Sequence, residues 1–388
     1  MKKILEIFCL SLVVLPFLIY SQSGDINTIK ESGNGIFFMY YDSSNSKSTI
    51  VEFEDFLALI EAPVLDQGGN ARELKDHEHG GEKILRTLNA YFNNKPLKYF
   101  LYSHWHPHSV STVNPFLRAG VKIVSTQKNY DVIKKFIDTV TISSYSENFI
   151  FVTDSLVIND NKNSITAHRF TKQDFPNVPT DDYLFFYMPK QNVLHCACMY
   201  NKWEGEPVDG KEMLTGREED LHRFLTTKGI SPDYLIRLSK EKKEPNDMQP
   251  MHGLQNVVNN GIKGTDIIKG FMETDQNVLD EQQDKMLQDI IKKNIPPSII
   301  NSTVYSLLRK KELKKALSFA RLQTLLNPSD PNSWDTFGEV YYFLGETQLA
   351  EYYEKQSKKI DPEYANGGME VWKKDLEEHQ KLWSETKD

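Results

Sequence analysis

The chain has 388 residues, of which 39% are hydrophobic and 26% charged, a composition typical of a globular protein with room for two domains. Its formal net charge is −8, and no basic stripe runs along it, which argues against a nucleic-acid partner.

The N-terminal segment has the parts of a secretory signal peptide. Lys2 and Lys3 form a basic head, and Ile7–Tyr20 is an apolar stretch followed by small polar residues. A membrane-spanning helix would need about 20 apolar residues and usually lacks such a head. We predict a signal peptide over residues 1–22 and a mature chain that is exported, to a periplasm or beyond the cell, without a transmembrane span. An uncleaved anchor is the alternative.

Beyond this segment, short apolar runs alternate with amphipathic stretches. Strands are expected at Gly35–Tyr41, Ser48–Phe53, Phe56–Ile60, Leu97–Tyr102, Val121–Ser125, Tyr183–Met188, Asn192–Cys198 and Tyr234–Arg237. Helices are expected at about Glu82–Phe92, Thr112–Ala119, Asn129–Asp138 and Glu218–Lys228. Strands in a meander, followed by strand–helix alternation, predict an α/β fold of layered sheets with helices outside.

Three histidines directly follow the apolar run Leu97–Tyr102, in the sequence SHWHPHS. His104, His106 and His108 stand at alternate positions, and alternate side chains of extended backbone point to the same side. Imidazole is the commonest metal ligand near neutral pH, and zinc takes nitrogen and sulfur donors in tetrahedral sites. The spacing predicts a metal site in this loop, with an ordinary polar loop as the alternative.

Two cysteines remain after removal of the signal segment, Cys196 and Cys198. Alternate strand residues lie about 6.6 Å apart, near the limit for bridging, so we expect no disulfide between them. Metal binding would explain why an exported protein keeps such a thiol. Burial of Cys198 as a small apolar side chain is the alternative.

Four segments within about residues 28–260 resemble motifs of the metallo-β-lactamase superfamily, in the same order. Ser103–Ser109 resembles the family's His-x-His-x-Asp-His motif, and Leu194–Met199 resembles its later strand that ends in Cys or Asp. Met251–Gly253 resembles its closing Gly-His-Gly turn, and Leu57–Pro63 its apolar strand that ends in Asp. The resemblance implies an αβ/βα sandwich and a zinc-dependent hydrolase.

The resemblance is incomplete at several positions. Glu61 replaces the Asp of the early strand, and the family's mid-chain His falls near Pro179, which has no ligand atom. Aligned position by position, the family's Asp falls on His108 and its third His on Ser109. A one-residue deletion would instead make His108 the third His. Both registers remain open, and a cap of the following helix is an alternative reading of Ser109.

One of the family's two ligand sets maps to His108, Cys198 and His252, which offer nitrogen, sulfur and nitrogen. Three protein ligands and an open fourth position suit catalytic zinc, so we predict a single zinc ion. His252 as a plain turn residue is the alternative. Asp181 or Asp182 is expected to supply the carboxylate of the missing catalytic Asp. The predicted metal ligands are His104, His106, His108, Cys198 and His252.

The chain becomes helical and charged from about Thr274. Pro331–Pro362 carries Trp, Gly, Tyr and Ala at tetratricopeptide spacing, with a plain helical hairpin as the alternative. Fewer than three clear repeats are marginal alone, so we expect this module to pack on the first domain or to cap a dimer. The expected division is a signal peptide (1–22), a metallo-β-lactamase-like domain (23–270), a linker helix (271–296) and an all-α helical repeat module (297–388).

Two functions of different classes follow from these features. The leading hypothesis is an exported hydrolase with one zinc ion, acting on an ester, amide or thioester of an unidentified small molecule. The rival is a catalytically inactive family member that binds a protein partner through its C-terminal repeats. Metal sequestration without turnover is a third reading.

Overall fold

The computed structural model describes residues 27–33, 35–41, 46–63, 76–200, 210–239, 247–293, 295–362, 364 and 367–385. The predicted signal segment, residues 1–22, lies outside these ranges. Two compact units make up the chain: unit 1 contains the described residues up to Ser125 with Tyr130–Phe151 and Asp160–Asn163, and unit 2 contains the others. Over the described ranges, no helix combines the length and the apolar character needed to cross a bilayer.

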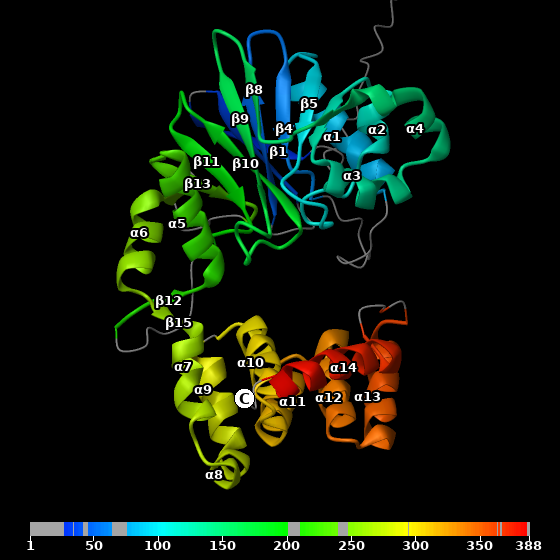
Figure 1. Ribbon diagram of the computed structural model, residues 1–388. Coiled ribbons are helices and arrows are strands. Elements are labelled where there is room, and N and C mark those ends of the chain that lie inside the picture. Colours follow the sequence, from blue (N-terminus) through cyan, green and yellow to red (C-terminus); the bar gives the residue numbers. More distant parts are fainter. Residues whose placement is uncertain are drawn as a thin grey trace, which may run out of the picture. The chain divides into compact units, whose positions relative to one another are not determined.

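Unit 1 is built on a seven-stranded sheet in which the strands follow one another in chain order, β1 to β7 (Figure 1). Strands β1 to β4 form an antiparallel meander, whereas β4, β5, β6 and β7 are parallel neighbours. The strands are β1 (Thr28–Gly33), β2 (Ile36–Tyr40), β3 (Lys47–Glu52), β4 (Leu57–Ile60), β5 (Leu97–Leu101), β6 (Lys122–Ser125) and β7 (Phe149–Phe151).

Helical crossovers join the parallel strands of unit 1, as parallel pairing requires. The connections contain α1 (Glu78–Tyr91), α2 (Asn114–Arg118), α3 (Gln127–Ile133), the 3-10 turn Lys134–Phe136, α4 (Thr139–Tyr145) and the 3-10 turn Ser146–Asn148. Apolar side chains of α1 and α2, such as Ile84 and Phe116, share one buried cluster with strand residues such as Leu59 and Phe100. These helices therefore cover the sheet face that carries those residues.

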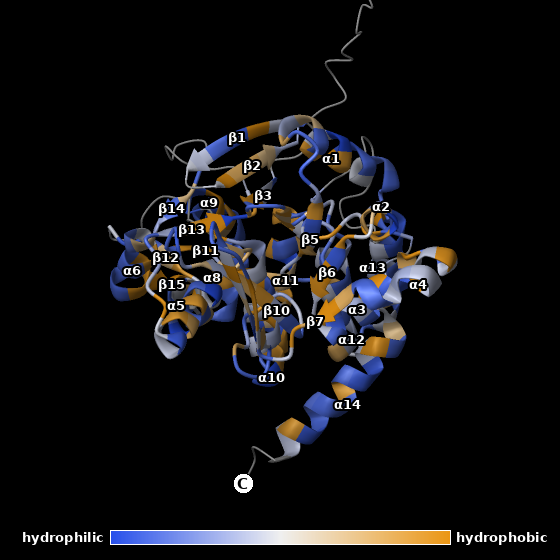
Figure 2. Ribbon diagram, turned by 90° about the horizontal axis from the view of Figure 1, so that it is seen from above, coloured by the Kyte–Doolittle hydropathy of each residue, from blue (hydrophilic) through white to orange (hydrophobic). Residues whose placement is uncertain are grey.

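Unit 2 begins with a six-stranded sheet in the order β14-β13-β11-β10-β9-β8. Strands β8 to β11 are antiparallel, β11 and β13 are parallel, and β13 and β14 are antiparallel. The strands are β8 (Ser155–Asn159), β9 (Ser164–Thr171), β10 (Asp182–Met188), β11 (Val193–Ala197), β13 (Tyr234–Arg237) and β14 (Gln249–Pro250). Strand β10 is hydrophobic along most of its length (Figure 2), and its side chains are nearly all buried.

Helices α5 (Gly216–Lys228) and α6 (Met251–Asn260) pack on this sheet, with Leu221, Phe224 and Leu254 in the same core as Phe185. A short parallel pair is formed by β12 (Met213–Leu214), which precedes α5, and β15 (Ile262–Lys263), which follows α6.

The rest of unit 2 is entirely helical within the part of the chain that the structure describes. Its helices are α7 (Gly264–Met272), α8 (Gln276–Glu281), α9 (Gln283–Lys292), α10 (Pro297–Arg309), α11 (Leu313–Leu326), α12 (Pro331–Phe343), α13 (Thr347–Ile360) and α14 (Met369–Glu385). Consecutive helices α10 and α11 pack together, as do α12 and α13. An α/β part with two helix-bearing sheets thus precedes an all-α segment, so the predicted fold class is confirmed.

Most of the expected elements form within a few residues of their predicted bounds, and β13 matches Tyr234–Arg237 at both ends. Several elements were not predicted from the sequence: β1, β7, β8, β9, β12, β14, β15, α4 and α6. The predicted linker helix, 271–296, contains the two short helices α8 and α9, and the predicted domain boundaries stay a prediction.

Candidate metal site

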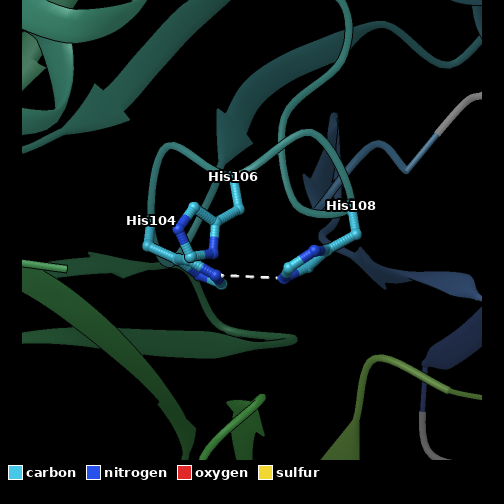
Figure 3. Close-up of side chains that lie close together, drawn as sticks. All are labelled: His104, His106 and His108. Atoms are coloured by element: carbon cyan, nitrogen blue, oxygen red, sulfur yellow. Dashed lines mark hydrogen bonds between the residues drawn. The ribbon is translucent and has the colours of Figure 1, made fainter. Parts of the chain in front are cut away.

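The three histidines of the loop after β5 come together in the structure. The side-chain donor atoms of His104, His106 and His108 all lie within 4.8 Å of one another, the single such group of three or more candidate ligands among the described residues. Figure 3 shows the three rings close together, with a dashed line between His104 and His108. Nε2 of His104 and Nε2 of His108 lie 3.1 Å apart.

A turn, and not an extended strand, produces this convergence. Residues 103–109 are bends and turns, and the carbonyl of His106 accepts hydrogen bonds from the backbone N–H groups of Ser109 and Val110. The prediction of convergence is therefore right, but its reason, alternation along extended backbone, is wrong. The return of the loop is fixed by Ala62, whose N–H donates to the carbonyl of Ser109.

Two serine hydroxyls contact the buried ring of His104 at Nδ1, the ring nitrogen that does not face His108. Nδ1 of His104 lies 2.7 Å from Oγ of Ser103 and 3.1 Å from Oγ of Ser109. These contacts orient the ring so that its other nitrogen, Nε2, points to His108. A hydrogen bond at one imidazole nitrogen sets the orientation and basicity of the nitrogen that binds a metal. His104 is fully buried, whereas His106 and His108 are partly exposed.

Beneath the serines lies the carboxyl group of Glu61, directly after β4. It is fully buried, and Oε1 accepts the backbone N–H of Ser103 at 3.0 Å. Burial raises the pKa of Glu61 to about 8, and hydrogen bonds from Ser103 and Ser109 oppose that rise. Glu61 has φ +64°, an uncommon conformation for a residue with a side chain, which indicates that the surrounding contacts impose it.

Ser109 is therefore part of the histidine cluster and does not cap α2. The α2 cap comes from Asp76, whose carboxylate accepts the backbone N–H groups of Val113 and Asn114 at 2.7 and 2.8 Å. The alternative reading of Ser109 as a helix cap is thus wrong. Nothing in the spacing of SHWHPHS indicates that both serines bond the same imidazole, because the turn that brings Ser109 back is not encoded in a recognisable pattern.

The other predicted site residues lie in unit 2. Cys198 follows β11 directly, after Ala197 with φ +45°, and is partly exposed. His252 is exposed in the first turn of α6. Cys196 and Cys198 form no disulfide, as expected. The assignment of Cys198 and His252 as metal ligands stays a prediction.

The two candidate carboxylates differ in their surroundings. Asp181 is exposed, whereas Asp182 is the first residue of β10 and is 1% exposed. Both carboxylate oxygens of Asp182 accept hydrogen bonds from the guanidinium group of Arg169, at 2.9 and 3.2 Å. Asp182 is thus engaged in a bidentate ion pair within unit 2. A catalytic role of either Asp stays a prediction.

No family model matches the chain, and no curated protein sequence matches it. Solved structures of metallo-β-lactamases do match it. One from Pontibacter korlensis is 14% identical and matches 60% of this chain and 97% of its own, with a TM-score of 0.42. One from Hirschia baltica is 12% identical over 60% of this chain and 97% of its own, with a TM-score of 0.40. One from Pseudomonas aeruginosa, in a mono-zinc form, is 12% identical over 60% of this chain and 94% of its own, with a TM-score of 0.41.

Proposed function

We propose that this chain is a metal-dependent hydrolase in which His104, His106 and His108 hold one zinc ion. The observation that carries the proposal is the convergence of three imidazole donors from one loop within 4.8 Å.

The spacing of one pair of donors in the cluster suits zinc. Two nitrogen ligands at 2.0–2.1 Å from a tetrahedral zinc lie about 3.3 Å apart. Nε2 of His104 and Nε2 of His108 are 3.1 Å apart, close to that value. Three imidazoles leave a fourth position for a water molecule or a substrate, which is the pattern of catalytic zinc sites.

When bound, such an ion supplies an activated water molecule at neutral pH and polarises a carbonyl oxygen. The residues of this chain have separate roles around it. Ser103 and Ser109 hold Nδ1 of His104, so that Nε2 is presented to the ion. Glu61 anchors the loop through the backbone of Ser103. Cys198 or His252 is proposed as a further ligand on the sequence motifs alone.

Metal content of the purified full-length chain tests the proposal. We expect about one zinc per chain after loading and dialysis, and loss of most of it in each of the variants His104→Ala, His106→Ala and His108→Ala. His79→Ala is the matched control, because His79 is an exposed histidine on α1. Equal zinc content in the control and in all three loop variants would refute the proposed site.

Two further variants, Cys198→Ser and His252→Ala, test the part played by unit 2. Loss of zinc in either variant would support that residue as a ligand, and unchanged zinc in both would restrict the site to the histidine loop. Hydrolysis is then screened with esters, thioesters, amides and lactams, each with and without a chelator. A zinc-loaded protein that hydrolyses none of them would favour metal sequestration or the inactive, protein-binding reading over the hydrolase.

Export is proposed on the sequence of residues 1–22 alone. N-terminal sequencing of the chain recovered from outside the cytoplasm of a bacterial host tests it. A new N-terminus close to residue 23 supports cleavage, and an intact Met1 in the cytoplasm contradicts it.

A further inference from the structure

The histidines of the loop after β5 differ in what surrounds them. His104 is fully buried, and the hydroxyls of Ser103 and Ser109 contact its Nδ1. The ring of His106 is partly exposed, with its centroid 4.7 Å from that of His104 and 5.3 Å from that of His108. A partly exposed imidazole can turn toward solvent by rotation about its side-chain bonds. The place of His106 in the cluster therefore depends on what else stands against its ring.

Among the described residues, the ring nearest to that of His106 belongs to its neighbour in the chain, Trp105. The two ring centroids are 4.5 Å apart and the ring planes meet at 85°, in a T-shaped pair, one of the favoured arrangements of aromatic rings. Successive side chains of extended backbone point to opposite sides, so an extended loop would direct Trp105 away from His106. Residues 103–106 bend instead, and the bend brings the two rings together.

The backbone of His106 is fixed on its C-terminal side. Its carbonyl accepts hydrogen bonds from the backbone N–H groups of Ser109 and Val110. The next residue, Pro107, is buried, and its ring restricts its own φ. What remains free is rotation about the two side-chain bonds of His106. A rigid neighbour beside the ring therefore decides how far the imidazole can turn.

Trp105 is such a neighbour, because the core of unit 1 holds it. Its side chain is partly buried and packs against the hydrophobic cluster that includes Tyr102, Val113 and Phe116. An indole ring that rests on this core cannot follow the imidazole of His106 outward without losing that packing. Trp105 is thus a fixed wall on one side of His106.

We infer that Trp105 is a positioning residue of the metal site: its indole ring keeps the imidazole of His106 in the rotamer that brings its donor atom to those of His104 and His108. This inference rests on the proposed zinc site. Indole Nε1 is a hydrogen-bond donor and has no lone pair for a metal ion, so Trp105 acts through His106 and not as a ligand. A ligand side chain that is already ordered loses less conformational freedom when the ion binds. Residues that orient a metal ligand typically contribute about 10- to 100-fold to metal affinity.

Zinc affinity of the full-length chain, measured by competition with a chelator, tests the inference. Trp105→Leu stays apolar but loses the flat ring, and Trp105→Phe keeps a smaller aromatic ring. Tyr130→Leu is the matched control: Tyr130 is another partly buried aromatic residue that packs against the same core, and its ring contacts Phe149 and Phe151. Thermal unfolding of each variant sets the temperature at which all of them are folded and are compared.

We expect Trp105→Leu to bind zinc about tenfold more weakly than the natural chain, Trp105→Phe to lie between them, and Tyr130→Leu to bind as the natural chain does. Cobalt(II) in place of zinc gives a spectroscopic readout, because its visible absorption depends on the number and geometry of its ligands. The spectrum of Trp105→Leu should move toward that of His106→Ala. A general loosening of the core would not produce this change, and Tyr130→Leu should keep the natural spectrum.

The outcomes separate this inference from the proposed function. If the natural chain binds no zinc, both are wrong. If the natural chain binds zinc and Trp105→Leu binds it equally tightly, or if Tyr130→Leu loses as much affinity as Trp105→Leu, the zinc site stands and the inference is overturned. Equal affinities of Trp105→Phe and Trp105→Leu, both weaker than that of the natural chain, would also overturn it, because a planar ring beside His106 would then contribute nothing.

Discussion

Replacing Gly338 by alanine probes the closest contact of the helical segment. Gly338 lies within α12, where alanine is favoured over glycine by about 1 kcal/mol. An added Cβ would approach Cη2 of Trp372 to 2.6 Å and the carbonyl oxygen of Ala350 to 3.3 Å. Because one neighbour is the rigid ring of a buried tryptophan and the other is backbone, the new atom cannot be accommodated without movement of α14.

Gly270 provides the matched comparison. It also lies in a helix, α7, but an added Cβ there meets nothing within 4 Å. Gly270→Ala should therefore gain the helix propensity alone, about 0.5–1 kcal/mol. Overpacking a buried site costs about 1–3 kcal/mol, and the contact at Gly338 is tight enough for the upper part of that range. The expected net effect of Gly338→Ala is about 1–2 kcal/mol of destabilisation.

Hydrogen exchange of the α14 amides measures the effect where it arises. A loss of about 1–2 kcal/mol lowers the protection of these amides about five- to thirtyfold in Gly338→Ala, whereas Gly270→Ala leaves them unchanged. Thermal unfolding should move in opposite directions for the two variants. If both variants were stabilised equally, the close packing of Trp372 on Gly338 would be refuted.

Three further predictions concern the metal site, pH dependence and unit 2. Ser109→Ala removes a hydroxyl contact of His104 and should lower zinc affinity about tenfold, as measured by competition with a chelator. Ser111→Ala, in the same loop, should leave the zinc affinity unchanged, because the hydroxyl of Ser111 donates to the carbonyl of Ala62. Equal affinities of the two variants would contradict the role of Ser109. The pKa of Glu339 is raised from its ordinary value near 4.5 to about 8, so the folded state binds the proton more tightly and this contribution to stability is lost as the pH rises from about 4.5 through 8. Denaturation at pH 5 and pH 9 should show a decrease in stability that is smaller in Glu339→Gln by the share of this one carboxyl, because Glu61 and Asp335, whose pKa values are also raised, contribute to the same decrease. An identical decrease in both proteins would argue against a buried carboxyl at Glu339. Arg169→Ala leaves the buried carboxylate of Asp182 unpaired and should lower the free energy of unfolding by about 3 kcal/mol. Lys228→Ala, which breaks an exposed ion pair, should change it by no more than about 0.5 kcal/mol. Equal thermal stability of the two variants would show that Asp182 does not depend on Arg169.

How far the sequence predicts this fold depends on how regular each local pattern is. Strand β10 is recognised because Tyr183–Met188 is a continuous run of apolar and aromatic residues, typical of a strand buried on both faces. Strand β9 is missed because its alternation fails at His168 and Arg169: Ile165 and Ala167 are buried, and the next buried residue is Phe170. The guanidinium group of Arg169 pairs with Asp182 on the neighbouring strand, a contact between distant segments that no local pattern contains.

The candidate site is predictable in residue type but not in geometry. Three histidines in five residues indicate a metal site, and the structure brings all three together. The turn that does so depends on hydrogen bonds between segments far apart in sequence, such as that from Ala62 N–H to the carbonyl of Ser109, 47 residues later. The burial of Glu61 beneath the loop depends on the same long-range pairing. Such contacts become visible only once the sheet is assembled.

The packing of the helical segment was also only partly predictable from the sequence. Trp, Gly and Tyr at repeat spacing indicate that α12 and α13 pair. The residues of α14 read as an ordinary charged helix, and His379 in particular reads as a surface residue. In the structure the His379 ring lies 5.1 Å from that of Phe343, in an edge contact, because α14 turns back onto α12. The direction in which a terminal helix turns back is set by tertiary packing and not by its own sequence.

X-ray absorption at the zinc edge of the loaded full-length chain tests the central claim most directly, because it counts the ligands of the ion without reference to activity. We predict three imidazole nitrogens at about 2.0–2.1 Å, with loss of one imidazole contribution in His106→Ala. A sulfur at about 2.3 Å in addition would identify Cys198 as the fourth ligand. A spectrum with fewer than two imidazoles, or one that is unchanged in His106→Ala, would contradict zinc binding by the loop of His104, His106 and His108.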